Sequence, residues 1–215
     1  MARYKLRRQF DVSEGSYGGN QMWHSKPRLV KTGCGPVALT NIFAYHLGLK
    51  LTQAEMTRLQ EEITEHLHGP VVMPLQFILG AKKLFKVYGF AIATETRTCF
   101  LHRRESYANI LALIRHSITL DRPVALLTGP NRLFHQTVYM PEFKNHWVLI
   151  TDLDSDPRTG GNHVGVSSWG EHFRVDLDQL AGSKMFISVV SLIIPGASGN
   201  QPALEKFTGK RSPDA

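Results

Sequence analysis

The spacing of apolar residues changes from helical to strand-like along this chain, and this change limits the fold more than any other feature. Helical spacing runs through 51–68, 73–90 and 107–123, and a further, almost wholly apolar helix is predicted to begin at Gly35 or Pro36. Strand-like runs occupy 90–97, 123–129, 146–154, 163–169, 172–177 and 186–194. Helices followed by a mostly antiparallel sheet of five or six strands indicate an α+β fold.

Local signals predict several boundaries of these elements. Thr52 and Glu55 form a capping box at the start of the 51–68 helix, and Gly69-Pro70 ends that helix. The segment 154–162 is rich in turn residues and predicts a hairpin between two strands.

The chain is long enough for one sizeable core, so we predict a single domain over 1–194. Residues 1–30 show no periodicity and are predicted to form an extended arm or loop. The composition of 195–215 predicts a disordered tail.

Composition limits the classes of function. The net charge is +7, but the basic residues are spread along the chain, which argues against a nucleic-acid interface. Two cysteines cannot form a disulfide framework, and we expect both to be reduced. We find no signal peptide and no run long enough to span a membrane, so the sequence predicts a cytoplasmic protein. The spacing of histidines, cysteines and acids predicts no metal site, and no cofactor is expected.

Cys34 lies where a loop turns into the first predicted long helix. Unpaired N–H groups at a helix N-terminus favour a thiolate, which is the nucleophilic form of cysteine. Gly33 and Gly35 flank the thiol and leave room for a substrate carbonyl. Cysteine is also among the most buried residue types, so a packing role is the alternative.

A cysteine nucleophile needs a base, and that base is usually histidine. Of the ten histidines, His146 stands at the mouth of a predicted strand, where a sheet can fix its orientation toward a cleft. An early cysteine that opens a buried helix, followed much later by a histidine that opens a strand, is the chain order of papain-type thiol enzymes.

Three blocks strengthen this likeness: "GCGPVAL", "RPVALLTG" and "NHWVLITDLD", followed by "VSSWG". Together they resemble the C39-like branch of the papain-type cysteine peptidases over about residues 20–194. The resemblance implies a papain-like fold and acyl transfer from a peptide or amide substrate.

The resemblance also assigns roles to single residues. It implies that Cys34 is the nucleophile and His146 the base, with the thiol pKa well below its free value of about 8.5. It also implies that Gln21 helps to form the oxyanion hole, for which an exposed loop glutamine is the alternative. Residues predicted to contact substrate are Gly33, Gly35, Asn145, Trp147 and Trp169.

The chain departs from the family at the group that holds the histidine. Where papain-type enzymes carry Asn or Asp, Ser167 stands in this sequence. A hairpin register pairing Asp152 with His163 would place His146 opposite Trp169 and close to Ser167 and Ser168. Asn162 and Asp152 are alternatives, but this register puts them at the far end of the hairpin. A serine hydroxyl accepts a hydrogen bond but offers no charge.

Three hypotheses therefore remain. The first is a thiol hydrolase, a C39-like cysteine peptidase or amidase. The second is a papain-like domain with impaired catalysis that binds a peptide or a partner in its cleft. The third is a basic protein that binds an anionic surface. The pKa of Cys34 separates the first two, and the salt dependence of binding marks the third.

Overall fold

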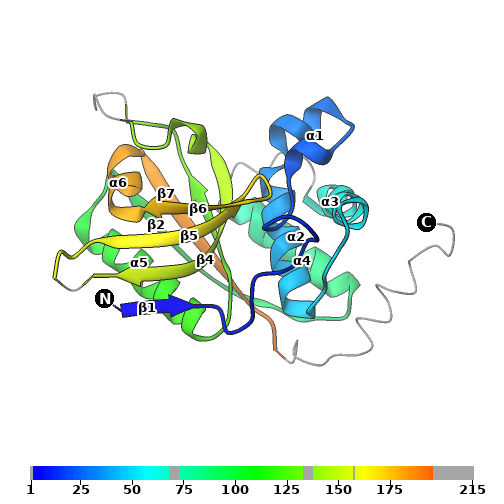
Figure 1. Ribbon diagram of the computed structural model, residues 1–215, viewed down its shortest axis with the longest axis horizontal. Helices are drawn as coiled ribbons and strands as arrows, with labels where there is room; N and C mark the ends of the chain where they lie inside the picture. The colour runs from blue at the N-terminus through cyan, green and yellow to red at the C-terminus, as the bar shows by residue number, and fades with distance from the viewer. Residues whose placement is uncertain (1, 68–72, 133–137, 157, 196–215) are drawn as a thin grey trace, which may run out of the picture.

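The computed structural model describes residues 2–67, 73–132, 138–156 and 158–195. A helical half and a sheet half lie side by side, with α1–α4 in the first and α5 and α6 beside the sheet in the second (Figure 1). The helices are η1 (Gln21–Trp23), α1 (Pro27–Thr32), α2 (Cys34–Leu47), α3 (Gln53–Leu67), α4 (Pro74–Val87), α5 (Arg104–Thr119), η2 (Pro141–Phe143) and α6 (Leu177–Ser183). The strands are β1 (Ala2–Lys5), β2 (Ala93–Phe100), β3 (Val124–Thr128), β4 (His146–Ser155), β5 (Asn162–Ser168), β6 (Glu171–Asp176) and β7 (Phe186–Ile193).

The strands form one antiparallel sheet with the order β2-β7-β3-β4-β5-β6. The start of β4 pairs with β3, and its end pairs with β1, where Tyr4 faces Leu153. Strands β3 and β4 are buried almost throughout, because helices and neighbouring strands cover them. The sheet therefore has seven strands in the described part of the chain, where five or six were expected.

Helix α2 joins the two halves. Nearly all of its side chains are buried, as its apolar sequence predicts, and it contacts both α3 and β4. Leu39, Ile42 and Phe43 are fully buried in the core. A helix enclosed in this way is held by packing rather than by intrinsic propensity. The first residue of α2 is thus fixed at the boundary between the halves.

The α+β prediction is confirmed, and the capping box forms as expected. The Thr52 backbone N–H donates to Glu55 Oε2 (3.0 Å), and the Glu55 N–H donates to Thr52 Oγ1 (3.3 Å). The predicted end of this helix at Gly69-Pro70 lies outside the described residues, as does all of the predicted tail after Pro195.

Several short elements differ from the expectation. The predicted arm 1–30 contains β1, η1 and the start of α1, and α6 follows β6 directly. Two of them, α1 and α6, have a local signal. Pro27 stands in the first turn of α1, and the Asp176 side chain caps α6 by accepting from the Gln179 N–H (2.9 Å). Strand β2 lies three residues later at both ends than predicted, and its later end includes Cys99.

The register predicted for the β4–β5 hairpin is wrong. His163 pairs with Asp154 rather than Asp152, and the register shifts between Ile150 and Asp152. A bulge of this kind inserts one extra residue into one strand, which no turn signal in the sequence announces.

Candidate active site

One small pocket at the boundary between the two halves brings together Cys34, His146 and Gln21, three of the residues singled out in the sequence. Ser167 and Ser168 from the end of β5 also line it. Its volume is about 10 Å³, which is room for about one water molecule. A substrate would therefore reach the sulfur from the pocket mouth rather than by filling a deep cavity.

Cys34 is the first residue of α2, and its thiol is a free one. Burial raises the pKa of the Cys34 thiol above its ordinary value, while the backbone N–H groups of Trp147, Gly35 and Cys34 itself oppose that shift. The three amides are the donors that a thiolate would need. The net direction is nevertheless opposite to the depressed pKa expected from the sequence, because removing the sulfur from water has the larger effect.

His146 is the first residue of β4 and is buried. It pairs with Thr128 of β3, and its backbone N–H donates to Thr128 Oγ1 (3.3 Å). Burial lowers the pKa of His146 to about 4, so the ring is neutral at neutral pH. A neutral imidazole can accept a proton, whereas an imidazolium cannot.

Ser168, and not Ser167, holds the His146 ring. His146 Nε2 lies 2.8 Å from Ser168 Oγ. The Ser167 hydroxyl donates to the Tyr17 carbonyl (2.6 Å) and lies 3.5 Å from Asn41 Nδ2. The two serines differ because adjacent residues of a strand point to opposite faces of the sheet. Asp152 and Asn162 lie toward the other end of the hairpin and engage other partners.

Gln21 lies in the pocket wall, and its Nε2 donates to the Val30 carbonyl (2.8 Å). An amide NH₂ has two N–H groups, so one remains for a ligand.

The two glycines beside the thiol are held by packing. Gly33 is the N-cap residue of α2, where a Cβ atom would lie 2.5 Å from the Leu29 carbonyl oxygen. Gly33 also caps the end of α1, where its N–H donates to the same Leu29 carbonyl (2.7 Å), so a side chain here would crowd the last turn of α1. Gly35 is buried in the first turn of α2.

Of the five predicted substrate contacts, Trp147 and Trp169 line the pocket, whereas Gly33, Gly35 and Asn145 do not. Asn145 is exposed, adopts a left-handed backbone conformation before β4 (φ 49°), and does not line the pocket. Trp147 contributes to the pocket wall, but its indole is buried and stacks on Phe77 of α4 (ring centroids 4.5 Å apart, 18° between planes). That stack fastens the helical half to β4 one residue after His146.

Trp169 covers the His146 ring. The two rings are parallel within 12°, with centroids 4.4 Å apart. Trp169 and Gly170 form the two-residue turn between β5 and β6, and both have positive φ (48° and 77°). Turns of this type favour Asn-Gly, because a left-handed conformation is costly for a bulky residue. The stack on His146 gives a reason for a tryptophan at this position.

Sequence reasoning missed Asn41, which is buried in α2 and lines the same pocket. Its Oδ1 accepts from the Gly19 N–H (2.9 Å), and its Nδ2 faces Ser167. It therefore ties the N-terminal segment, α2 and β5 together behind the thiol. A polar residue in the middle of an otherwise apolar helix was the signal that could have identified it.

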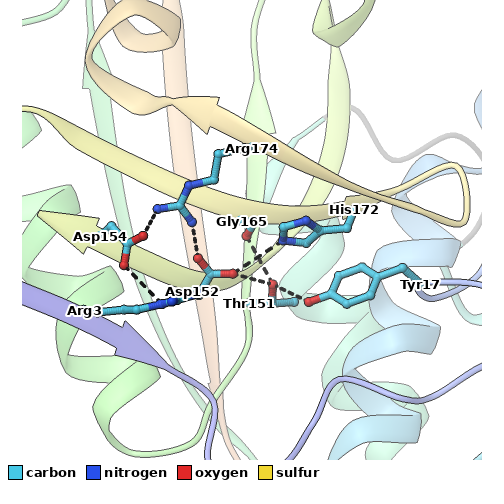
Figure 2. A network of polar contacts seen from close by, with 8 residues as sticks. All are labelled: Arg3, Tyr17, Thr151, Asp152, Asp154, Gly165, His172 and Arg174. Carbon is cyan, nitrogen blue, oxygen red and sulfur yellow. Dashed lines mark hydrogen bonds and ion pairs between the residues drawn. The ribbon is translucent and has the colours of Figure 1, made fainter.

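Beyond Ser167, a polar network continues along the outer side of β4 (Figure 2). Arg174 of β6 bridges the carboxylates of Asp152 and Asp154. His172 Nε2 lies 3.6 Å from Asp152 Oδ2. The Tyr17 hydroxyl donates to Thr151 Oγ1 (2.9 Å). The network lies next to the pocket of Cys34 and His146 but does not enter it.

No group of three or more metal-binding side chains occurs in the described ranges. Within the same ranges, every helix is too short or too polar to cross a membrane.

No protein-family model matches the sequence, and no curated protein does. Among solved structures, the chain is similar to UfSP from C. elegans. The two share 12% sequence identity, and the match has a TM-score of 0.51 and covers 90% of this chain and 34% of that chain. At this identity the likeness shows the fold alone. The fold is papain-like, and the chain spans about a third of the length of the structure that it matches.

Proposed function

We propose that this protein is a thiol hydrolase that transfers an acyl group from a peptide or amide to Cys34 and then to water. The observation that carries the proposal is the meeting of Cys34, at the start of α2, with His146, at the start of β4, in one pocket of a papain-like fold. The blocks that resemble the C39-like peptidases contain both residues, which favours that branch.

In the proposed reaction, His146 takes the proton from the Cys34 thiol as the sulfur attacks the substrate carbonyl. Because Ser168 engages Nε2, Nδ1 is the nitrogen left to accept this proton. The required tautomer carries hydrogen on Nε2, which then donates to Ser168 Oγ. The imidazolium returns its proton to the leaving amine, and a thioester remains on Cys34. Water, deprotonated by His146, cleaves the thioester and regenerates the thiol.

The oxyanion that forms during attack would accept hydrogen bonds from the Cys34 backbone N–H and from the free N–H of Gln21 Nε2. Gln21 is held for this role by its bond to the Val30 carbonyl, so its amide need not reorganise when charge develops. The backbone N–H groups of Gly35 and Trp147 lie near the sulfur and would stabilise a transient thiolate.

The protonation states favour general-base catalysis over a preformed ion pair. The Cys34 pKa is raised and the His146 pKa is lowered to about 4, so both groups are neutral at pH 7. General-base catalysis needs the neutral imidazole. Activity should therefore fall on acidification only as the pH approaches about 4, instead of near the ordinary histidine value of about 6.5.

The same observation supports a second candidate, a papain-like module that binds a peptide without cleaving it. Ser168 supplies no negative charge to stabilise an imidazolium. In such a module, the reactivity of Cys34 would not depend on His146.

Alkylation of Cys34 by iodoacetamide, followed by mass spectrometry across pH, tests the proposal. We expect His146→Ala to slow alkylation of Cys34 at pH 7 by about 100-fold, the lower range for general-base assistance. His116→Ala removes an exposed histidine of α5 and should have no effect. Equal rates in wild type and His146→Ala would reject the hydrolase and leave the binding module.

A further inference from the structure

A second and larger cavity lies beside the pocket of Cys34, separated from it by the contact between Ser167 and Tyr17. The Ser167 hydroxyl, which lines the first pocket, donates to the carbonyl of Tyr17, which lines the second. The cavity has a volume of about 370 Å³. This is within the range of small-molecule sites, about 300–1,000 Å³. Of the described residues, none lines both pockets.

Four cationic side chains from one short segment line this cavity: Arg3, Lys5, Arg7 and Arg8. The segment includes β1, in which alternate side chains share a face, so Arg3 and Lys5 point the same way. Tyr4 points to the other side, where Arg115 of α5 lies over its ring. The cations are therefore gathered by the strand and its continuation.

Two of these cations are already paired. Arg3 Nε lies 3.5 Å from Asp154 Oδ1, and Arg8 Nε lies 3.7 Å from Asp121 Oδ2. The side chains of Lys5 and Arg7 are exposed, and no carboxylate of a described residue lies within ion-pair distance of either. Lys5 and Arg7 are thus the two charges available to a ligand.

One carboxylate, that of Asp152, also lines the cavity and would repel an anion if its charge were free. Arg174 binds it directly, and His172 Nε2 lies 3.6 Å away (Figure 2). The lining residues and their ion-pair partners together contain five cations and three carboxylates. The net charge of this group is therefore +2. The cations are Arg3, Lys5, Arg7, Arg8 and Arg174, and the carboxylates are Asp121, Asp152 and Asp154.

The remaining wall is aromatic and apolar. Phe10 and Tyr17 line the cavity with their ring centroids 5.0 Å apart, and Leu6 lies beside them. The Tyr17 ring is fixed by its hydroxyl bond to Thr151 and by the edge of the His172 ring (centroids 4.8 Å apart). A ligand that fills the cavity would therefore meet cations at one side and rings at the other.

We propose that this cavity binds a small organic phosphate, with its phosphate group on Lys5 and Arg7 and its apolar body against Phe10 and Tyr17. A phosphomonoester carries a charge of about −1.5 to −2 at pH 7, which matches two unpaired cations better than the single charge of a carboxylate. Arg and Lys are also the side chains that bind phosphate by charge-assisted hydrogen bonds. The site is independent of the proposed thiol chemistry.

Isothermal titration calorimetry of the full chain with phenyl phosphate, benzoate and inorganic phosphate tests this proposal. We expect phenyl phosphate to bind more tightly than benzoate, which lacks the second charge, and than inorganic phosphate, which lacks the ring. Lys5→Gln/Arg7→Gln should weaken phenyl phosphate binding at least about tenfold, since two charge-assisted contacts are lost. Lys5→Arg/Arg7→Lys keeps both charges and should retain binding.

A matched control removes the same two charges elsewhere. Arg58→Gln/Lys82→Gln changes exposed residues of α3 and α4 and should leave the affinity within about twofold, since these charges are distant and screened. An equal loss in this control would overturn the proposal, as would no binding of phenyl phosphate or equal binding of benzoate. If inorganic phosphate binds as tightly as phenyl phosphate, the proposed contact of the ligand with Phe10 and Tyr17 is rejected.

Discussion

At the scale of single residues, the distinction between Ser167 and Ser168 decides how His146 is held. Ser168 contacts the ring through Nε2, whereas Ser167 anchors the backbone of Tyr17. A hydroxyl at Ser168 can fix the orientation of the ring and its tautomer without adding charge. This fits a neutral imidazole that acts as a general base.

We expect Ser168→Ala to slow alkylation of Cys34 at pH 7 up to about tenfold, because one hydrogen bond contributes about 0.5–1.5 kcal/mol. Ser168→Asn restores a hydrogen-bonding group and should recover part of the rate. The measurement is the rate of iodoacetamide modification, with the His146 tautomer followed by nitrogen NMR.

Ser167→Ala is the matched control, since it removes the same hydroxyl from the neighbouring position. It should leave the His146 tautomer unchanged. If Ser167→Ala and Ser168→Ala slow the reaction equally, the two serines act through general packing and the positioning role of Ser168 is rejected.

The sequence could identify Cys34 and His146 as residues of one pocket, because each opens an element whose periodicity is clear. It could not choose between the two serines. That choice depends on a register shift of one residue in the β4–β5 hairpin, and such a shift exchanges the two faces of a strand. The bulge that causes the shift arises from pairing between strands and leaves no local pattern.

At the scale of elements, the turn between β5 and β6 holds Trp169 in an unfavourable backbone conformation, and this conformation brings its ring into contact with His146. Trp169 adopts a left-handed conformation that Asn would adopt more readily, and its ring covers the imidazole. The sequence "SSWG" shows a turn glycine, but the position of the indole depends on the geometry of the whole hairpin.

We expect Trp169→Asn to raise the pKa of His146 from about 4 toward the ordinary value of about 6.5, because the ring would regain contact with water. Trp169→Phe keeps an aromatic cover and should change the pKa much less. A proton NMR titration of the His146 ring measures both. A His146 pKa that stays near 4 in Trp169→Asn would show that other groups, such as Phe143, exclude water from the imidazole.

At the scale of the whole molecule, the α+β architecture follows from sequence periodicity, while the way in which the two halves meet does not. The burial of α2 is predicted by its almost wholly apolar sequence, and β3 and β4 are predicted as strands. The joint formed by Phe77 and Trp147 depends on tertiary packing between distant segments. Short elements such as α6 were missed because a seven-residue helix has little periodicity to detect.

Buried histidines should make the folded state sensitive to acid. Burial lowers the pKa of both His46 and His146 to about 4, while both titrate near 6.5 when unfolded. The unfolded chain therefore binds protons first, and stability is lost as the pH falls from about 6.5 toward 4, by up to about 3 kcal/mol for each histidine. Urea unfolding at pH 7 and pH 4.5 measures this loss.

His46→Gln should lessen that loss, since glutamine does not titrate. His102→Gln, at an exposed site, should not. A wild-type free energy of unfolding that is equal at the two pH values would contradict the buried neutral state of both histidines.

The parallel stack of Trp169 on His146 also gives the protein a built-in optical reporter. A positive charge on the imidazole, stacked 4.4 Å from the indole between ring centroids, should change the emission of Trp169 as His146 gains its proton. Trp23 and Trp147 emit as well, and a variant that keeps Trp169 as its one indole would isolate the signal. Stopped-flow mixing with an acylating reagent could then follow the transfer of that proton without a peptide substrate.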